Sequence, residues 1–529
     1  MTGTQYLGGA QSAELNDTFH GIDPRNGSEI STAFHEASPS EIDRAVSIAA
    51  GAFDSFRATS IETRAKLLDA IAEEILAQGT ALTERASAET GHPMPRCEME
   101  RDRAANQSRV FAKLLREGSW CDARIDVADP GRTPIPKPDV RSVMRPIGPI
   151  AVYGASNFPI AISVLGSDTV SAFASGCPVV IKGHPAHPGT CEIAAGIAYA
   201  AIQKVGLSPE IFSLVQGRSH RVGLELVQHP LLAGAAFTGS LGGGRALFDA
   251  ANNREVPIPF YAEMGSINPI FLLPGALKER AESIANGFVT SLTMGVGQFC
   301  TNPGMVVGLE SEGLAKFNQT ASAAVESWAP ATMLHAGIHE AYESGISERE
   351  KSDSLELLAK SSSPADPAKS EAAAYLFTTS HKGLMEDDST LAELFGPVST
   401  VVKCDARAQL LELAERLEGS LSISVHGTEA DLAEYGDLIA VLERKAGRLI
   451  FNGYPVGIEV NDSIHHGGPY PATAHAHFTS IGTRSISRFV RPVCYQDWPD
   501  AALPEALQNA NPQGILRIVN GERTRDAVS

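Results

Sequence analysis

The sequence of 529 residues lacks any pair of cysteines in a C-x-x-C spacing, and its seven cysteines are scattered along the chain. An odd number of cysteines without regular spacing argues against a disulfide framework, and the missing pair argues against a structural zinc site. Residues 1–17 also lack the basic patch and apolar run of a signal peptide. We therefore expect reduced thiols, no metal site and a cytoplasmic location.

Basic residues are scarce as well. Lysine and arginine total 43 against 62 aspartate and glutamate residues, and the formal net charge is -19. This balance argues against a nucleic-acid partner and against an anionic membrane surface. The negative net charge does not exclude a small anionic substrate, because a local group of arginines can create a positively charged site.

A long uninterrupted apolar run is also missing. Residues 147–181 carry a single charge, Asp168, but prolines and glycines interrupt the segment throughout. These breaks exclude a membrane-spanning helix, and a buried strand, a helix and a second buried strand fit the segment better.

What is present is a repeated alternation of strand and helix patterns that begins near Arg145. It predicts a parallel sheet in an α/β fold of the nucleotide-binding class. The predicted strands are Ile150–Tyr153, Pro178–Ile181, Ile211–Val215, Ala235–Thr238 and Ile258–Ala262. The predicted helices between them are Pro159–Ala174, Gly189–Val205, Val222–Gln228 and Gly243–Ala251.

The flanking regions complete this outline. Before Arg145 the periodicity predicts helices, and after Gly265 a second α/β unit. The helices are 38–57, 61–77, 98–115, 277–292 and 313–328, and the later strands are 305–309, 400–403, 422–425 and 448–451. Two extended segments, 125–143 and 485–493, are expected to pair with each other or with another subunit. The tail after Pro504 shows no pattern.

Three residues at the edges of apolar, strand-like segments carry complementary chemistry: Cys300 in GVGQFCTNP, Glu263 in AEMGS and Asn157 in ASNFP. A thiol that attacks, an amide that stabilises an oxyanion and a carboxylate that activates water suffice to oxidise an aldehyde through a thioester. We expect Glu263 to be partly buried with a raised pKa. Taken singly, each residue also fits a structural role: a buried thiol, a paired carboxylate and a turn asparagine.

Two further segments suit a nucleotide cofactor. The glycine-rich run from Thr238 to Arg245 follows a predicted strand and opens a helix, where backbone N–H groups can bind a phosphate. Its spacing is not GxGxxG, so a tight helix-entry turn is an equal interpretation. Lys182 follows another strand and can bind a ribose or its 2′-phosphate, whereas His184 suits either a cofactor contact or a turn.

Together these segments resemble the aldehyde dehydrogenase superfamily over nearly the whole chain. The motifs that carry the resemblance, in chain order, are ETG at 89–91, ASNFP at 155–159, FTGS at 237–240, EMG at 263–265, GQFC at 297–300 and FGP at 395–397. Longer runs, including KGHPAHPGT from Lys182 and HGGPYPAT from His466, are similar to the α-ketoglutaric semialdehyde dehydrogenase branch. That branch also includes a fatty-aldehyde enzyme.

The resemblance implies a fold and roles for particular residues. It implies a Rossmann-type cofactor domain (1–124 and 144–262), an α/β catalytic domain (263–480), a small β oligomerisation arm (125–143 and 481–499) and a tail (500–529). Cys300 would be the nucleophile, Glu263 the base and Asn157 an oxyanion donor. The cofactor residues would be Lys182, His184, Gly239, Ser240, Glu393 and Phe395. A homodimer or homotetramer is expected.

The implied reaction is the NAD(P)-dependent oxidation of a small aldehyde, with α-ketoglutaric semialdehyde as the expected substrate. His184-Pro185 replaces the glutamate that many NAD-preferring relatives carry, which favours NADP, with NAD as the alternative. Arg101, Arg103 and Arg109 share one predicted helix and are candidates for a substrate carboxylate, although a solvated helix face explains them equally. The competing functions are a CoA-acylating dehydrogenase, an esterase and a non-catalytic nucleotide-binding or structural protein.

Overall fold

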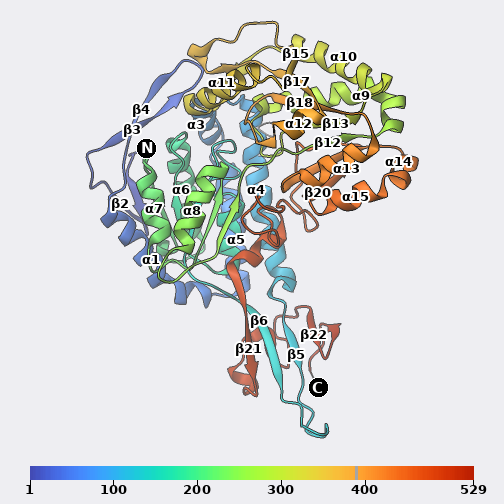
Figure 1. Cartoon of the computed structure of the whole chain (residues 1–529). Helices are drawn as coiled ribbons and strands as arrows, with labels where there is room; N and C mark the ends of the chain where they lie inside the picture. Colours follow the sequence, from blue (N-terminus) through green and yellow to red (C-terminus); the bar gives the residue numbers. More distant parts are fainter. Residues whose placement is uncertain (388–390, 529) are drawn as a thin grey trace.

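The computed structural model describes residues 1–387 and 391–528, which form two large sheets and a smaller projecting one (Figure 1). The first sheet is seven-stranded. Its strands, in spatial order, are β11 (Phe260–Glu263), β10 (Gly234–Thr238), β7 (Ile150–Tyr153), β8 (Val179–Lys182), β9 (Phe212–Val215), β1 (Gln5–Leu7) and β2 (Ala10–Ser12). The five strands from β11 to β9 are parallel, whereas β1 and β2 run antiparallel. The predicted parallel sheet is confirmed, and the N-terminal strands β1 and β2 are additional.

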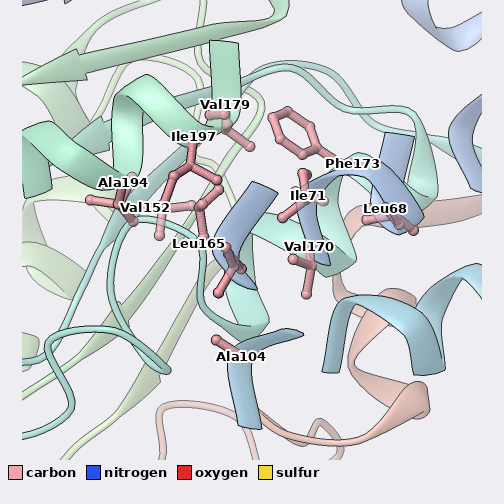
Figure 2. Close-up of a cluster of buried hydrophobic side chains, with 14 of the residues drawn as sticks. Leu68, Ile71, Ala104, Val152, Leu165, Val170, Phe173, Val179, Ala194 and Ile197 are labelled. Atoms are coloured by element: carbon pink, nitrogen blue, oxygen red, sulfur yellow. The ribbon is translucent and has the colours of Figure 1, made fainter. Parts of the chain in front are cut away.

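Helices cover both faces of this sheet, which explains why its strands read as continuous apolar runs. The helices of the first sheet are α1 (Pro39–Arg57), α2 (Ile61–Ala77), α3 (Ala81–Thr90), α4 (Met94–Glu117), α5 (Ser167–Ser175), α6 (Pro188–Lys204), α7 (His220–Gln228) and α8 (Leu241–Asn252). Along β7, Ile150 and Val152 pack with α2, α5 and α6, and Ala151 and Tyr153 pack with α1 and α7. Figure 2 shows part of the first of these cores, to which α2 contributes Leu68, α5 contributes Phe173 and α6 contributes Ile197.

The second large sheet has the order β15 (Glu356–Lys360), β17 (Tyr375–Ser380), β18 (Val398–Cys404), β13 (Met305–Leu309), β12 (Ile270–Leu272), β19 (Ser420–His426) and β20 (Ala446–Phe451). All neighbours are parallel except β15 and β17. The helices α9 (Pro274–Thr293) and α10 (Glu312–Ser327) pack on one face. The opposite face is covered by α12 (His381–Glu386), α13 (Arg407–Arg416) and α15 (Gly436–Glu443). The remaining helices of this half are α11 (Ala336–Glu350) and α14 (Glu429–Glu434).

A five-stranded sheet forms an arm that extends away from the body and carries the C-terminus (Figure 1). Its order is β21 (Val490–Gln496), β6 (Val140–Pro146), β5 (Arg124–Asp126), β22 (Arg517–Val519) and β23 (Glu522–Thr524). The two extended segments do pair with each other, because β6 and β21 are antiparallel neighbours. The tail, which showed no sequence pattern, contributes β22 and β23. A separate hairpin, β3 (Thr18–Asp23) and β4 (Ser28–His35), lies near the N-terminus.

Two predicted elements were wrong in extent. The helix predicted over 159–174 begins only at Ser167, because residues 159–166 form turns and Gly166 adopts the extended conformation of an N-cap. The strand predicted over 485–493 begins at Val490, after a 3₁₀ helix over Thr483–Phe489. In that helix the buried Arg488 turns inward to meet Asp168 at 2.7 Å, which an extended strand facing solvent would not permit.

Within the described ranges, no helix combines the length and the apolar character needed to cross a membrane.

Candidate active site

The catalytic candidates come from the ends of elements in both large sheets. Glu263 is the last residue of β11, and Asn157 follows β7, both at the carboxyl edge of the first sheet. Cys300 lies between α9 and β13, in a turn that enters the second sheet. The structure therefore brings together side chains that are remote in the sequence, at the edge where open α/β sheets bind ligands.

A histidine links the thiol to the carboxylate. The Sγ of Cys300 lies 3.3 Å from the Nε2 of His466, and the same Nε2 lies 3.0 Å from the Oε1 of Glu263. The ligand atoms of all three residues lie within 4.8 Å of one another. His466 and Glu263 are buried, whereas Cys300 retains partial exposure. This geometry forms a path by which a proton can move from the thiol toward the carboxylate.

The prediction that Glu263 has a raised pKa was wrong. Burial alone raises the pKa of this carboxyl, but its interaction with His466 and hydrogen bonds from the Ser480 hydroxyl and the Cys300 thiol outweigh burial and leave the pKa lowered. Glu263 is consequently a carboxylate at neutral pH. The sequence could not indicate this, because His466 and Ser480 lie about two hundred positions downstream.

The pKa of the Cys300 thiol is shifted in the opposite direction from that of Glu263. Burial and the neighbouring charge of Glu263 raise the pKa of Cys300 well above its usual value of 9.0, with Glu393 adding to the effect and Arg103 opposing it. The side chain is thus a thiol, not a thiolate, at neutral pH, and it needs a proton acceptor to become a nucleophile.

Asn157 lies against the segment that leads to the thiol. Its Nδ2 donates to the Gln298 carbonyl at 3.1 Å, two residues before Cys300. A carboxamide has two N–H groups, so one donor remains for a substrate oxygen. Its own backbone carbonyl is held by His92 Nε2 at 3.2 Å. One hydrogen bond therefore orients the side chain of Asn157, and another fixes its backbone.

The glycine-rich run forms the exposed N-terminus of α8. Ser240 is the N-cap and its Oγ accepts a hydrogen bond from the Gly243 N–H at 3.3 Å. Gly239 and Ser240 are exposed, and no atom lies within 4 Å of the place where Gly242 would carry a Cβ. A diphosphate can approach these N–H groups without a steric barrier, so this helix entry fits the cofactor that the fold implies.

Lys182 and His184 lie together at the end of β8. The Nζ of Lys182 donates to the Gly217 carbonyl at 2.6 Å, and burial lowers the pKa of this ammonium to about 8. Burial also lowers the pKa of His184 well below 6.5, so its ring is neutral, and it stacks on His187 at 5.3 Å. Lys182 therefore offers a cation at the strand end, and His184 an uncharged ring beside it.

Glu393 and Phe395 precede β18 and line a small cavity with Ser266 and Arg349. Glu393 is exposed at the edge of this cavity. Its carboxyl group is a hydrogen-bonding partner for a ribose hydroxyl there.

The three arginine candidates separate in the structure. Arg101 pairs with Asp102 on the outer side of α4, and Arg109 is exposed. Arg103 alone turns toward the site, and its guanidinium lies over the Phe158 ring at 5.4 Å.

His466 is the residue that sequence reasoning missed. It stood in the run HGGPYPAT, which contributed to the family resemblance, but no role was attached to it. The only signal was a histidine followed by two glycines, and such a pattern is common in turns.

The comparisons with known proteins agree with this geometry. The model of the aldehyde dehydrogenase family matches residues 11–469. The chain belongs to the aldehyde dehydrogenase family. It is 43% identical over 524 residues to an α-ketoglutaric semialdehyde dehydrogenase 2 of Azospirillum brasilense, with 99% of each chain covered. It is 41% identical over 525 residues to an α-ketoglutaric semialdehyde dehydrogenase of Acinetobacter baylyi, again with 99% of each covered.

Among solved structures, a betaine aldehyde dehydrogenase of Staphylococcus aureus in complex with NAD⁺ has the same fold. Its TM-score is 0.79 at 20% identity, covering 94% of this chain and 96% of that one. The expected fold class and the aldehyde dehydrogenase class of enzyme are thereby confirmed. The division into domains and the role of each site residue remain predictions.

The raised pKa of Cys300 predicts a pH dependence of its reactivity. In the cofactor-free enzyme, iodoacetamide should alkylate Cys300 slowly at pH 7, and the rate should climb only as the pH passes 9, because the thiolate forms there. Peptide mass spectrometry follows the modification of Cys300, and the exposed Cys494 serves as an internal reference thiol. A rate at Cys300 that is already maximal at pH 7 would contradict the assignment.

Proposed function

We propose that this enzyme oxidises α-ketoglutaric semialdehyde to 2-oxoglutarate, with NADP as the preferred coenzyme and Cys300 as the nucleophile. The observation that carries the catalytic part is the chain of contacts from Cys300 through His466 to Glu263. The substrate rests on the two relatives named for this aldehyde, which match 99% of the chain at 43% and 41% identity.

The first step is attack on the aldehyde carbon. In the neutral tautomer that carries its proton on Nδ1, His466 has a free lone pair on Nε2, and the Sγ–H proton passes to it while sulfur forms a bond to the carbonyl carbon, whose oxygen becomes an oxyanion. Glu263 stabilises the imidazolium that results. The free N–H of Asn157 and the backbone N–H of Cys300 are the donors for the oxyanion, and a donor of this kind contributes about 10²–10³ in rate.

Bound NAD(P)⁺ supplies a hydride acceptor at this point. Lys182, the N-terminus of α8 at Ser240, and Glu393 with Phe395 are the groups that would hold its ribose, diphosphate and nicotinamide ends. The oxidised carbon remains on Sγ as a thioester.

Hydrolysis completes the reaction. Glu263, an ionised carboxylate at neutral pH, takes a proton from water, and the hydroxide attacks the thioester carbon. Sulfur leaves as a thiolate, which regains its proton from His466. A CoA-acylating enzyme would not need a carboxylate to activate water, so the presence of Glu263 beside the thiol favours hydrolysis. An esterase would run without a cofactor, and the formation of reduced nicotinamide separates it from the dehydrogenase.

The preference for NADP rests on the surroundings of Lys182. His184-Pro185 stands where many NAD-preferring relatives carry a glutamate. The buried carboxylate of Glu36 already accepts the Arg218 N–H at 2.8 Å and the Ser219 N–H at 3.3 Å. Lys182 has only the Gly217 carbonyl as a hydrogen-bond partner in the described chain. A 2′-phosphate would thus meet a cation and no free carboxylate.

The proposal also includes the oligomeric state of the enzyme and its location in the cell. β21 leaves one side of the arm sheet without a partner strand, an edge suited to pairing with a second copy in a homodimer or homotetramer. The cytoplasmic location rests on the thiol content, since all seven cysteines are free.

The substrate assignment predicts a ranking. The enzyme should give the highest kcat/KM with α-ketoglutaric semialdehyde among a panel that also holds succinic semialdehyde and long-chain aldehydes, each with both coenzymes. Formation of reduced nicotinamide is the readout, and Cys300→Ala should abolish it for every aldehyde. A clear preference for long-chain aldehydes would contradict the proposed substrate. Activity retained in Cys300→Ala would contradict the proposed role of Cys300 as the nucleophile.

The roles of His466 and Glu263 are separable by rapid kinetics. Glu263→Gln should keep a fast burst of one reduced nicotinamide per site, followed by slow turnover, because hydrolysis is impaired. His466→Ala should slow the burst itself by about 10²–10⁴, the usual contribution of a general base. The neighbouring His465→Ala is the matched control and should leave both phases unchanged. A normal burst in His466→Ala would remove this residue from the mechanism.

The coenzyme assignment predicts an asymmetric effect of Lys182→Met. Loss of the ammonium should raise the KM for NADP⁺ by about 10–100-fold, the value of a charge-assisted hydrogen bond, and the KM for NAD⁺ by much less. Lys204→Met, at the exposed end of α6, should alter neither KM. Equal changes for the two coenzymes would show that Lys182 does not contact a 2′-phosphate.

A further inference from the structure

Arg103 is a cation next to the thiol whose hydrogen-bonding capacity is largely unused. Its Nε and Nη2 atoms are buried, and no described residue accepts a hydrogen bond from either one. No described carboxylate forms an ion pair with it either. Buried guanidinium groups are normally paired, because unmade hydrogen bonds in a dry environment are costly.

The other arginines near the site have protein partners. Arg96, one helical turn earlier on α4, donates to the Glu100 carboxylate at 2.9 Å. Arg448, on β20, donates from Nη2 to the Pro455 carbonyl at 2.6 Å and from Nη1 to the Gly457 carbonyl at 3.2 Å. Both guanidinium groups therefore hold the protein together. Arg103 does not share this function.

Glu100 does not supply the missing partner for Arg103. One of its oxygens is engaged by Arg96, and the other accepts the Ile160 N–H at 3.4 Å. The carboxyl is therefore committed to fixing the chain after Asn157. An acceptor for Arg103 has to come from outside the protein.

Two aromatic rings connect Arg103 with the segments that carry Asn157 and Cys300. Its guanidinium lies over Phe158, the residue after Asn157, and Phe158 meets Phe299 edge to face at 5.4 Å. Phe299 directly precedes Cys300. The cation is close enough to the sulfur that it acts to lower the pKa of the thiol, against the larger effects of burial and Glu263. Arg103 thus lies near both the nucleophile and, through Phe158, the segment that carries Asn157.

We propose that Arg103 determines specificity by binding the carboxylate of an acidic aldehyde while its far end reacts with Cys300. The inference rests on the proposed function and assigns the substrate class to one residue. A planar guanidinium with two free donors matches a carboxylate, or the carboxylate and keto oxygens of a 2-oxo acid, in a two-point contact. Phe158 and Phe299 supply an apolar wall for the methylene groups between the two ends.

The test compares a charged aldehyde with an uncharged one of the same length. Arg103→Met should lower kcat/KM for α-ketoglutaric semialdehyde by about 10–100-fold, mainly through KM, because a charge-assisted contact is lost. Its kcat/KM for pentanal should stay unchanged or rise. Arg103→Lys keeps the charge but not the planar guanidinium, so its kcat/KM for α-ketoglutaric semialdehyde should lie between those of the wild type and Arg103→Met. Arg109→Met, on the exposed side of the same helix, is the matched control and should match the wild type on both aldehydes.

The outcomes separate this inference from the proposed substrate. Equal losses on both aldehydes would make Arg103 a structural residue, and an undiminished kcat/KM for the semialdehyde would remove it from recognition; either result overturns the inference. If the wild type prefers 5-oxopentanoate, an acidic aldehyde without the keto group, and Arg103→Met abolishes that preference, the inference holds and the proposed substrate falls. If the wild type prefers pentanal to every acidic aldehyde, both fall.

Discussion

The site depends on a single nitrogen atom that is shared by two partners. The Nε2 of His466 lies within hydrogen-bonding distance of both the Cys300 sulfur and the Glu263 carboxylate. Burial and a nearby negative charge hold the thiol in its protonated form, and the same imidazole keeps the carboxylate ionised. The thiol and the carboxylate therefore lie beside one imidazole in opposite protonation states. That arrangement allows a thiol to be activated and a thioester hydrolysed in the same small volume.

The two sheets position the parts of this site by a simple rule. Parallel strands align their carboxyl ends at one edge, so β7, β8, β10 and β11 deliver Asn157, Lys182, Gly239 and Glu263 to the same side of the first sheet. The second sheet brings Cys300 and Glu393 from just before β13 and β18. Helices on both faces of each sheet bury the strands, which leaves these edges as the places where polar side chains meet.

Charge is distributed unevenly in this protein, and the difference matters for its substrate. The chain as a whole carries a formal charge of -19, yet Arg103, Arg96 and Arg448 lie around the catalytic thiol. Two of them are held by protein acceptors and one is not. An overall acidic protein can thus present a local cationic pocket to an acidic aldehyde, since interactions at short range in a dry site outweigh the screened field of the surface.

The sequence by itself determined the α/β class and most of the helices and strands, and it singled out Cys300 as the candidate nucleophile. These depend on local signals: apolar periodicity and the short motifs around Cys300 and Glu263. Only the tertiary structure decided that His466 joins the thiol to the carboxylate, that Glu263 is ionised although buried, and that the C-terminal tail completes the arm. Each of these results depends on residues far apart in the chain, and the charge state of a buried group is set by the neighbours that folding brings to it.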